Sequence, residues 1–206
     1  MRIELQQVSK GRGLALPETS LAYGEGEALL AVAETEQRPT VLGLIAAGRM
    51  RPGTGRVLID GEEHPAEIRR RVTLVDAPEV SDPVPDVSVF GVVAEELMFA
   101  GRPAGRRAVR TWLAEAGMAS IGGIPIADVA PALRLRLLLE LAVLRPDVRG
   151  IVLVAPDRHG GDPVTWWELA EEFAARGPAV LVIAGAASAA VLDGRARRAE
   201  TVEVAR

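Results

Sequence analysis

Apolar residues along the chain form short strand-like runs in some places and stretches with helical spacing in others. The first strand-like run, residues 3–8, is followed by a glycine-rich turn at residues 11–13. The further strand-like runs of the first part are residues 20–23, 28–33, 56–60 and 71–75. Residues 40–48 suit a short buried helix that is closed by Gly48. This pattern predicts an antiparallel start that leads into a buried central strand.

The middle of the chain changes to helical periodicity. Residues 76–86 are rich in Pro and Asp and are predicted to form a loop. Apolar residues then recur at helical spacing over residues 88–100 and 106–118, with no strand-like run between them. The later part predicts helices at residues 132–144, 164–176 and 187–192 and strands at residues 151–155, 179–184 and 201–204.

Strand, helix and strand in succession favour a parallel sheet with right-handed crossovers, and hence an α/β fold. A chain of 206 residues is short enough to fold around a single hydrophobic core. We therefore expect a single domain over residues 1–206. Its α/β core would comprise residues 1–78 and 132–206, and residues 79–131 would form an inserted helical subdomain.

Composition narrows the range of functions. The chain is 49% hydrophobic and 25% charged, which disfavours global disorder, and its formal net charge of -4 disfavours nucleic acid as a partner. It contains no cysteine, which removes disulfides and thiolate chemistry. Glu4 interrupts any secretory signal, and no apolar run reaches the roughly 20 residues of a membrane span. We expect a cytoplasmic location without direct membrane insertion, so that any link to the inner face of the cell membrane runs through a partner.

Six segments, in order, resemble the nucleotide-binding domain of ABC transporters. They are IELQQVSK (3–10), RMRPGTGRVLIDGEE (49–63), IRRRVTLVDAP (68–78), PDVSVFGVVAEELMFAGRP (85–103), LRLRLLLELAVLRPDVRGIVLVAP (133–156) and RGPAVLVIA (176–184). The resemblance implies a P-loop-NTPase-like ABC ATPase core, with a parallel central sheet, an antiparallel N-terminal sheet and an inserted helical subdomain.

The phosphate loop that this resemblance implies is degenerate. Such a loop needs G-x-x-x-x-G-K-[ST], in which backbone N–H groups cradle phosphate and the lysine offsets its charge. The residues at these positions are Ala33, Glu34, Glu36, Arg38, Pro39 and Thr40. No shift of the alignment restores the motif, because Lys10 is the chain's only lysine. Proline also removes a backbone donor, and the two glutamates oppose an anion.

The other family motifs are also lost. The signature segment falls on Val129, Ala130, Pro131, Ala132 and Leu133. The acidic pair of the hydrolytic strand falls on Ala155 and Pro156, and the switch histidine falls on Gly185. The switch glutamine falls near Asp76, and Asp162 is the one survivor, at the position that resembles the D-loop. We therefore expect no catalytic residue, no cofactor and nucleotide affinity that is millimolar or weaker.

Several remaining residues allow two interpretations. Asp157, His159 and Asp162 could form a metal or acid–base cluster at a strand end, but a solvated turn is the simpler interpretation and we predict no metal. His64 fits a surface turn. The arginine runs 69–71 and 106–110 are most simply solvated helix faces, although an acidic partner or lipid head groups would also suit them.

Contact with a partner is expected at two places. In the resembled family a groove beside the helical subdomain receives a short helix of the membrane subunit. The candidate residues here are Val84, Val87, Val89 and Phe90. Trp166 and Trp167 are adjacent on a predicted helix and diverge by about 100°, so one of them could mark a second contact surface.

The leading hypothesis is a noncatalytic, ABC ATPase-like interaction or regulatory subunit. Its partners would be a membrane protein subunit, an intact ABC ATPase or both, in a homo- or heterodimer. One alternative is a degenerate subunit of a heteromeric ABC transporter that contributes to ATP-driven transport. Another is a binding module for a different small ligand in the vacated cleft.

Overall fold

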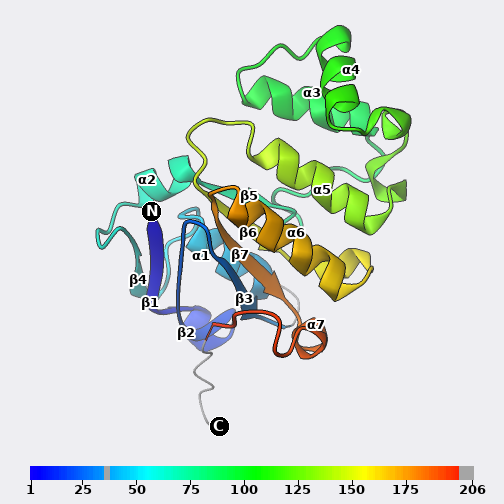
Figure 1. Ribbon diagram of the computed structural model, residues 1–206. Helices are drawn as coiled ribbons and strands as arrows, with labels where there is room; N and C mark the ends of the chain where they lie inside the picture. Colours follow the sequence, from blue (N-terminus) through cyan, green and yellow to red (C-terminus); the bar gives the residue numbers. More distant parts are fainter. Residues whose placement is uncertain (35–37, 200–206) are drawn as a thin grey trace. The chain divides into compact units, whose positions relative to one another are not determined.

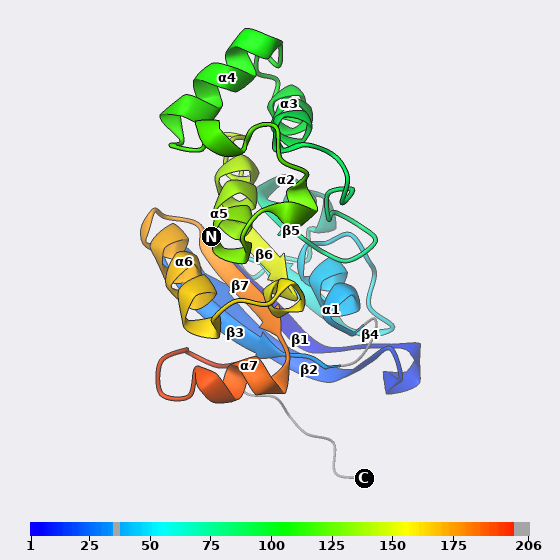
Figure 2. The same cartoon turned by 90° about the vertical axis from the view of Figure 1, so that its right-hand side faces the viewer.

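The computed structural model describes residues 1–34 and 38–199, and its contacts divide the chain into two compact units. The first unit combines Met1–Ser81 with Asp147–Arg206, and the second comprises Asp82–Pro146. Figures 1 and 2 show the sheets with their helices and the group of helices at residues 89–142, which interrupts the sheet-forming parts of the sequence.

The first unit contains two sheets. One is antiparallel, with strand β1 (Arg2–Lys10) between β2 (Leu16–Gly24) and β4 (Thr54–Ile59). The other is parallel, in the order β3 (Ala28–Val32), β7 (Ala179–Ala184), β6 (Gly150–Val154) and β5 (Val72–Val75). Every residue of β5, β6 and β7 is buried, as expected for strands of a parallel sheet that is covered on both faces.

Helix α1 (Arg38–Ala46) packs against strands of both sheets and joins them into one core. Gly43 permits this close approach, because a Cβ atom at that position would lie 2.7 Å from a methyl group of Val154 on β6. Helix α6 (Pro163–Ala175) packs on β7 and β3 and also contacts the short helix α7 (Ala186–Val191). Figure 2 shows α1 and α6 on opposite sides of the parallel strands.

A short helix that the sequence analysis did not anticipate, α2 (Pro65–Arg71), precedes β5. His64 caps it, since its Nδ1 accepts a hydrogen bond of 3.3 Å from the backbone N–H of Glu67. Arg70 and Arg71 both contact the Glu67 carboxylate, and Arg70 also contacts Asp147. The hydrogen bond from Arg70 holds the pKa of Glu67 below its usual value.

The second unit is helical. It contains α3 (Val89–Phe99), α4 (Arg106–Glu115) and α5 (Pro131–Ala142), with single 3₁₀ turns at Ala119–Ile121 and Ile126–Asp128. Ser88 begins α3 as its N-cap, because its hydroxyl accepts from the Gly91 N–H at 3.2 Å. The N–H groups of Val89 and Phe90 donate to the carbonyls of Ile124 and Gly122, so the start of α3 is fixed to the loop before α5.

The predicted fold class is confirmed: a parallel four-stranded sheet, an antiparallel three-stranded sheet and helices form an α/β arrangement. The predicted strand at residues 201–204 lies outside the described residues. Contacts group α5 with the second unit, whereas the sequence analysis assigned residues from 132 onward to the core. The core cluster of the first unit contains residues of β1, β2, α1, β6 and β7.

Tyr23 on β2 provides a test of this core. Its side chain is fully buried opposite Ile3, and its hydroxyl has no hydrogen-bond partner among the described residues. Burial raises the pKa of this hydroxyl well above its usual value. We expect Tyr23→Phe to raise the free energy of unfolding by about 1 kcal/mol, because it removes an unpaired buried polar group.

Urea unfolding of the two proteins would measure this difference. Tyr23→Ala is the comparison variant, with an expected loss of about 3–5 kcal/mol from the cavity it leaves. A loss of stability in Tyr23→Phe would show that the hydroxyl has a bonding role, contrary to the expectation.

Candidate functional site

The carboxyl ends of β3, β5, β6 and β7 lie along one edge of the parallel sheet, which is where open α/β sheets bind ligands. Each strand is followed at this edge by a residue that the sequence analysis placed in a degenerate motif or beside one. Glu34 follows β3, Asp76 follows β5, Ala155 follows β6 and Gly185 follows β7. We take this edge as the candidate site.

Two carboxylates bind the beginning of α7 at this edge. Asp157 Oδ2 accepts from the Gly185 N–H at 2.9 Å and from the Ser188 hydroxyl at 3.0 Å. Glu34 Oε1 accepts from the Ala186 N–H at 2.8 Å. These two N–H groups belong to the N-cap and the first residue of α7, and N–H groups at the start of a helix have no partner within the helix. The chain's own carboxylates therefore occupy both of these N–H groups.

Gly185 makes room for this arrangement. A Cβ atom at residue 185 would lie 3.3 Å from Asp157 Oδ2 and 3.8 Å from Glu34 Oε1. The residue at the position of the switch histidine therefore lies directly beside both carboxylates. A larger side chain here would have to displace at least one of them.

A second ionic group lies after β5 and β6. Asp76 is 1% exposed, and its carboxylate contacts Arg158 Nη2 at 2.9 Å and His159 Nε2 at 3.0 Å. Arg158 Nη1 also donates to the carbonyls of Asp76 and Val154. Asp76 and Ala155 both have positive φ, at 59° and 47°, in the left-handed region that non-glycine residues rarely adopt. The buried carboxylate is thus held by two side chains from the turn after the neighbouring strand.

The structure accounts for most of the phosphate-loop residues. Ala33 is half-buried, Glu36 lies outside the described residues, and Arg38, Pro39 and Thr40 form the first turn of α1. Proline is compatible with this turn because the first helical N–H groups have no partner within the helix. Arg38 donates from Nε to the Leu14 carbonyl at 3.4 Å, in the N-terminal part of the first unit.

The remaining motif positions also have structural roles. Asp162 is the N-cap of α6, where its carboxylate accepts from the Val164 N–H at 2.9 Å. Pro156 is buried and begins a 3₁₀ turn that runs to His159. In the second unit, Val129 is buried, and Ala130 and Pro131 begin α5, followed by Ala132 and Leu133. Asp157, His159 and Asp162 contact different partners and do not form one cluster.

Some of the residues predicted to contact a partner are buried in the structure. Val89, Trp166 and Trp167 are all buried, because Val89 faces the packed side of α3 and both tryptophans belong to the buried part of α6. The diverging side chains of the two tryptophans are thus both covered, and we no longer propose these three residues as partner contacts. Val84 is exposed, and Val87 and Phe90 are half-buried.

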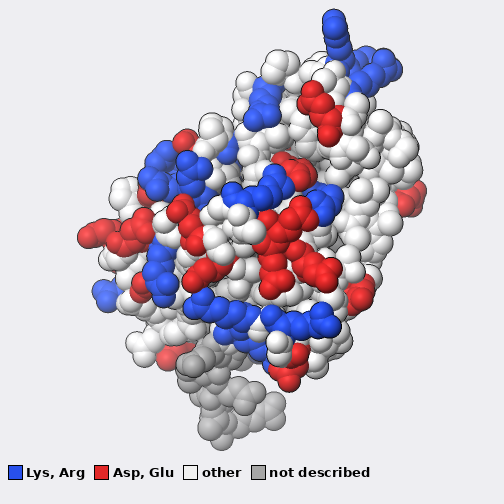
Figure 3. All heavy atoms as spheres, viewed as in Figure 1, with Lys and Arg blue, Asp and Glu red and all other residues white. Residues whose placement is uncertain are grey.

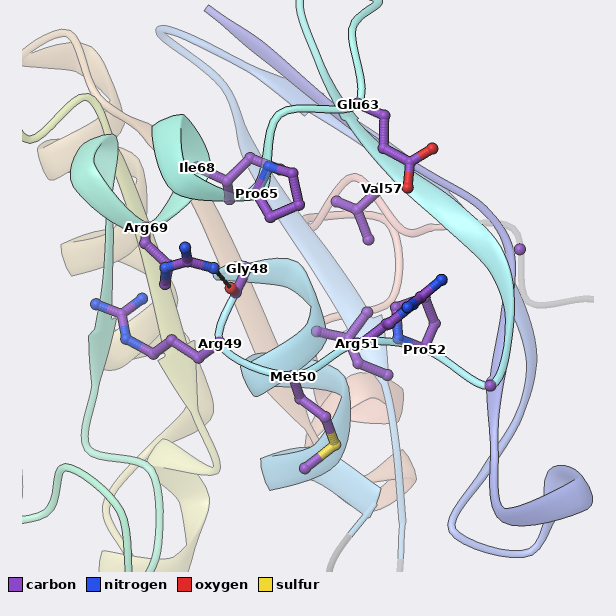
Figure 4. A pocket seen from close by; sticks show the side chains of 13 residues that line it. Gly48, Arg49, Met50, Arg51, Pro52, Val57, Glu63, Pro65, Ile68 and Arg69 are labelled. Carbon is purple, nitrogen blue, oxygen red and sulfur yellow. Dashed lines mark hydrogen bonds between the residues drawn. The ribbon is translucent and has the colours of Figure 1, made fainter.

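A pocket of about 440 Å³ lies at the other end of α1, between α1, β4 and α2 (Figure 4). Arg69 Nη1 donates to the Gly48 carbonyl at 3.0 Å, and Arg49 Nη1 donates to the carbonyls of Ala47 and Val72. These arginines satisfy carbonyls at and beyond the carboxyl end of α1. The two arginine side chains therefore cap the carboxyl end of α1.

Two properties bear on metals and membranes. Among residues 1–34 and 38–199, no three His, Asp or Glu side chains gather in a way that could hold a metal ion. Within the same ranges, no helix has both the length and the apolar character needed to cross a membrane.

Sequence reasoning missed the ionic partners at the sheet edge. Arg158 and Ser188 were not singled out, and Asp76 was noted only as the place of a lost glutamine. One signal could have indicated these partners. Asp76 and the turn Asp157–His159 each follow a predicted strand, and a parallel sheet brings the ends of neighbouring strands together. Arg158 and Asp76 are separated by 82 positions, so the pairing itself has no local signature.

A scan against models of protein families gives no match, and a search of curated proteins gives none either. Solved structures do match. An ATP-binding subunit of an ABC transporter is similar over 92% of this chain and 82% of its own, with 19% identity and a TM-score of 0.59. A dimeric bacterial ABC transporter cassette is similar over 92% of this chain and 90% of its own, with 18% identity and a TM-score of 0.63.

A nucleotide-free ATP-binding cassette from an ABC transporter is similar over 89% of this chain and 81% of its own, with 15% identity and a TM-score of 0.63. The three matches cover 89–92% of this chain and therefore extend over both compact units. The chain therefore has the fold of the ATP-binding cassettes of ABC transporters.

Proposed function

We propose that this chain is a noncatalytic protein with the ABC cassette fold that acts as an interaction or regulatory subunit. The observation that carries the proposal is the sheet edge, where Glu34 and Asp157 occupy the N–H groups at the start of α7. The partner would be a membrane subunit of a transport system, an intact ABC ATPase or both. Such a partner would keep the chain in the cytoplasm or at the inner face of the cell membrane.

Charge at the edge opposes a nucleotide. Three carboxylates, of Glu34, Asp76 and Asp157, lie at the strand ends, and Arg158 is bound to that of Asp76. Two like charges about 4 Å apart repel by about 4 kcal/mol at an effective dielectric constant of about 20. This is about the difference between micromolar and millimolar binding, which is roughly 8 against 4 kcal/mol.

Lost phosphate contacts act in the same direction. Pro39 stands where the lysine of a phosphate loop would stand, and the side chain of Arg38 is bound to the Leu14 carbonyl. A hydrogen bond to a charged group contributes about 1.5–3 kcal/mol, so the missing lysine alone would weaken binding about tenfold or more. Repulsion and lost contacts together favour a chain that works without ATP.

A degenerate subunit of a heteromeric transporter is the second candidate, and it is favoured by the dimeric state of one similar cassette. This chain would then contribute a surface to the ATP site of another subunit. An intact ABC ATPase purified with and without this chain, and assayed for ATP hydrolysis, would distinguish the two functions. A composite site requires this chain for ATP hydrolysis, whereas an interaction subunit leaves hydrolysis by the isolated ATPase intact.

Isothermal titration calorimetry tests the absence of nucleotide binding. With Mg-ATP at millimolar concentration we expect no binding heat above dilution, because the site is anionic and lacks its phosphate loop. An intact ABC cassette in the same buffer is the positive control. A dissociation constant in the micromolar range would contradict the proposal directly.

The role of Asp157 gives a second test. Asp157→Ala leaves the Gly185 N–H and the Ser188 hydroxyl without this acceptor, so we expect it to lower the free energy of unfolding by about 1–3 kcal/mol. Asp157→Asn retains an acceptor oxygen and should lose less. Urea unfolding of both variants measures the difference.

Glu34→Ala is the matched control, because Glu34 is exposed and water can replace its hydrogen bond. Its expected loss is smaller than that of Asp157→Ala. Wild-type stability in Asp157→Ala would mean that this carboxylate is not needed at the edge and remains free to serve a ligand.

A further inference from the structure

Basic and acidic side chains gather around α2 (Figure 3), and several of them pair within the fold. Arg70 and Arg71 both contact the Glu67 carboxylate. Arg51 and Glu63 differ from these residues, because neither side chain has a hydrogen bond or ion pair within residues 1–34 and 38–199. Both line the pocket of about 440 Å³ between α1, β4 and α2.

The inner part of this pocket is apolar. Ile45 of α1, Val57 of β4 and Ile68 of α2 are buried and contribute to its lining from three different elements. Figure 4 shows the Val57 side chain directed into the pocket. An apolar group of a ligand would therefore leave water on entering, which favours binding.

Close packing fixes the walls of the pocket. A Cβ atom at Gly48 would lie 3.0 Å from the Ile68 Cβ, and one at Gly55 would overlap the Gln6 carbonyl oxygen. Both glycines also have positive φ, at 66° and 70°. The end of α1 thus packs directly on α2, and β4 packs directly on β1. The pocket is therefore formed without a ligand, and its volume is within the range of small-molecule sites.

The turn that contains Arg51 is anchored to β1, although the Arg51 side chain is not. Lys10 Nζ donates to the Arg51 carbonyl at 2.7 Å, and the Gly53 N–H donates to the Ser9 carbonyl at 2.6 Å. These two bonds fix the backbone beside the pocket. The five N–H donors of the Arg51 guanidinium are available to a ligand, since nothing in the described part of the chain bonds to them.

Arg69 adds a second cation to the lining. Its Nη1 donates to the Gly48 carbonyl at 3.0 Å, and this bond holds the guanidinium at the wall that α1 and α2 share. The Arg49 side chain points away from Val57 in Figure 4, because it donates to carbonyls of residues that do not line the pocket. Arg51 and Arg69 are therefore the cations that a ligand would meet.

We propose that this pocket binds a small zwitterion with an apolar body, of the class of the apolar amino acids. The apolar body enters the pocket beside Val57. The carboxylate of the ligand pairs with Arg51 and Arg69, since guanidinium groups form charge-assisted hydrogen bonds with carboxylates. The ammonium group of the ligand pairs with Glu63.

The two signs of charge at the pocket distinguish a zwitterion from simpler ligands. A purely anionic ligand would place its charge beside Glu63, and a purely cationic ligand would place its charge beside Arg51 and Arg69. A zwitterion gives each of these side chains a partner of opposite sign. Figure 4 shows Glu63 and Arg51 on the side of the pocket that β4 forms, so one end of a small ligand can meet both.

The pocket is separate from the sheet edge. It lies at the carboxyl end of α1, whereas Arg38 and Pro39, which stand in place of the phosphate loop, begin that helix. A ligand here is an addition to the noncatalytic function proposed above. Micromolar binding of Mg-ATP would remove that function and leave this ligand site in place. Failure of the ligand test would leave the calorimetric result unchanged.

A nuclear magnetic resonance titration of the isotopically labelled full chain tests the proposal, with leucine as the probe. We expect millimolar leucine to shift backbone signals within residues 45–69. Isocaproate, which is leucine without its ammonium group, should bind about fivefold or more weakly. Isopentylamine, which is leucine without its carboxylate, should also bind about fivefold or more weakly.

Three variants assign the contacts. Glu63→Gln should remove the preference for leucine over isocaproate, because it removes the partner of the ammonium group. Arg51→Gln should reduce the preference for leucine over isopentylamine. Val57→Phe should abolish leucine binding while keeping every charge, because the larger side chain fills the pocket.

Glu62→Gln and Arg107→Gln are the matched controls. Both residues are exposed, neither lines the pocket, and neither side chain has a partner among the described residues. Each control should bind leucine as tightly as the wild-type chain. Circular dichroism of each variant checks that the chain folds. If Val57→Phe does not fold, the three probes on the wild-type chain and on Glu63→Gln still decide.

Three results would overturn the proposal. The first is the absence of any leucine-dependent shift in the wild-type chain. The second is equal affinity of the wild-type chain for leucine and isocaproate, which would mean that the ammonium group has no partner. The third is unchanged leucine affinity in folded Val57→Phe, which would mean that leucine binds elsewhere.

Discussion

Hydrogen bonds that acidic side chains accept from backbone N–H groups hold the carboxyl edge of the parallel sheet together. Asp157 connects the turn after β6 to the start of α7, and Glu34 connects the end of β3 to the same helix. The adjacent Asp76 connects β5 to that turn through Arg158 and His159. These side-chain contacts thus connect all four strands of the sheet, in addition to the backbone hydrogen bonds between neighbouring strands.

The same edge shows how the chain supplies partners to the polar groups at its strand ends. Polar groups at strand ends require partners, whether these are ligands or side chains. In this chain carboxylates supply acceptors to α7, Asp162 caps α6, and Arg38 bonds to the Leu14 carbonyl. Residues that could have been remnants of a lost function therefore have present structural roles.

Local sequence signals predicted much of this structure. The continuous apolar runs of β3, β6 and β7 indicated buried parallel strands, and Ser88 marked the start of α3. Helix α2 was missed because seven residues with only Ile68 buried give no helical period. The burial of Trp166 and Trp167 depends on what covers both sides of α6, which no local pattern reveals. At the site, sequence predicted that motif residues are missing, but it did not reveal which side chains from separate strands meet there.

The attachment of Asp157 to α7 has a thermodynamic consequence. A ligand that binds the folded state stabilises it by an amount that depends on its concentration, whereas an internal carboxylate acts at constant effective concentration. The contribution of Asp157 to the order of this sheet edge is therefore independent of ligand concentration.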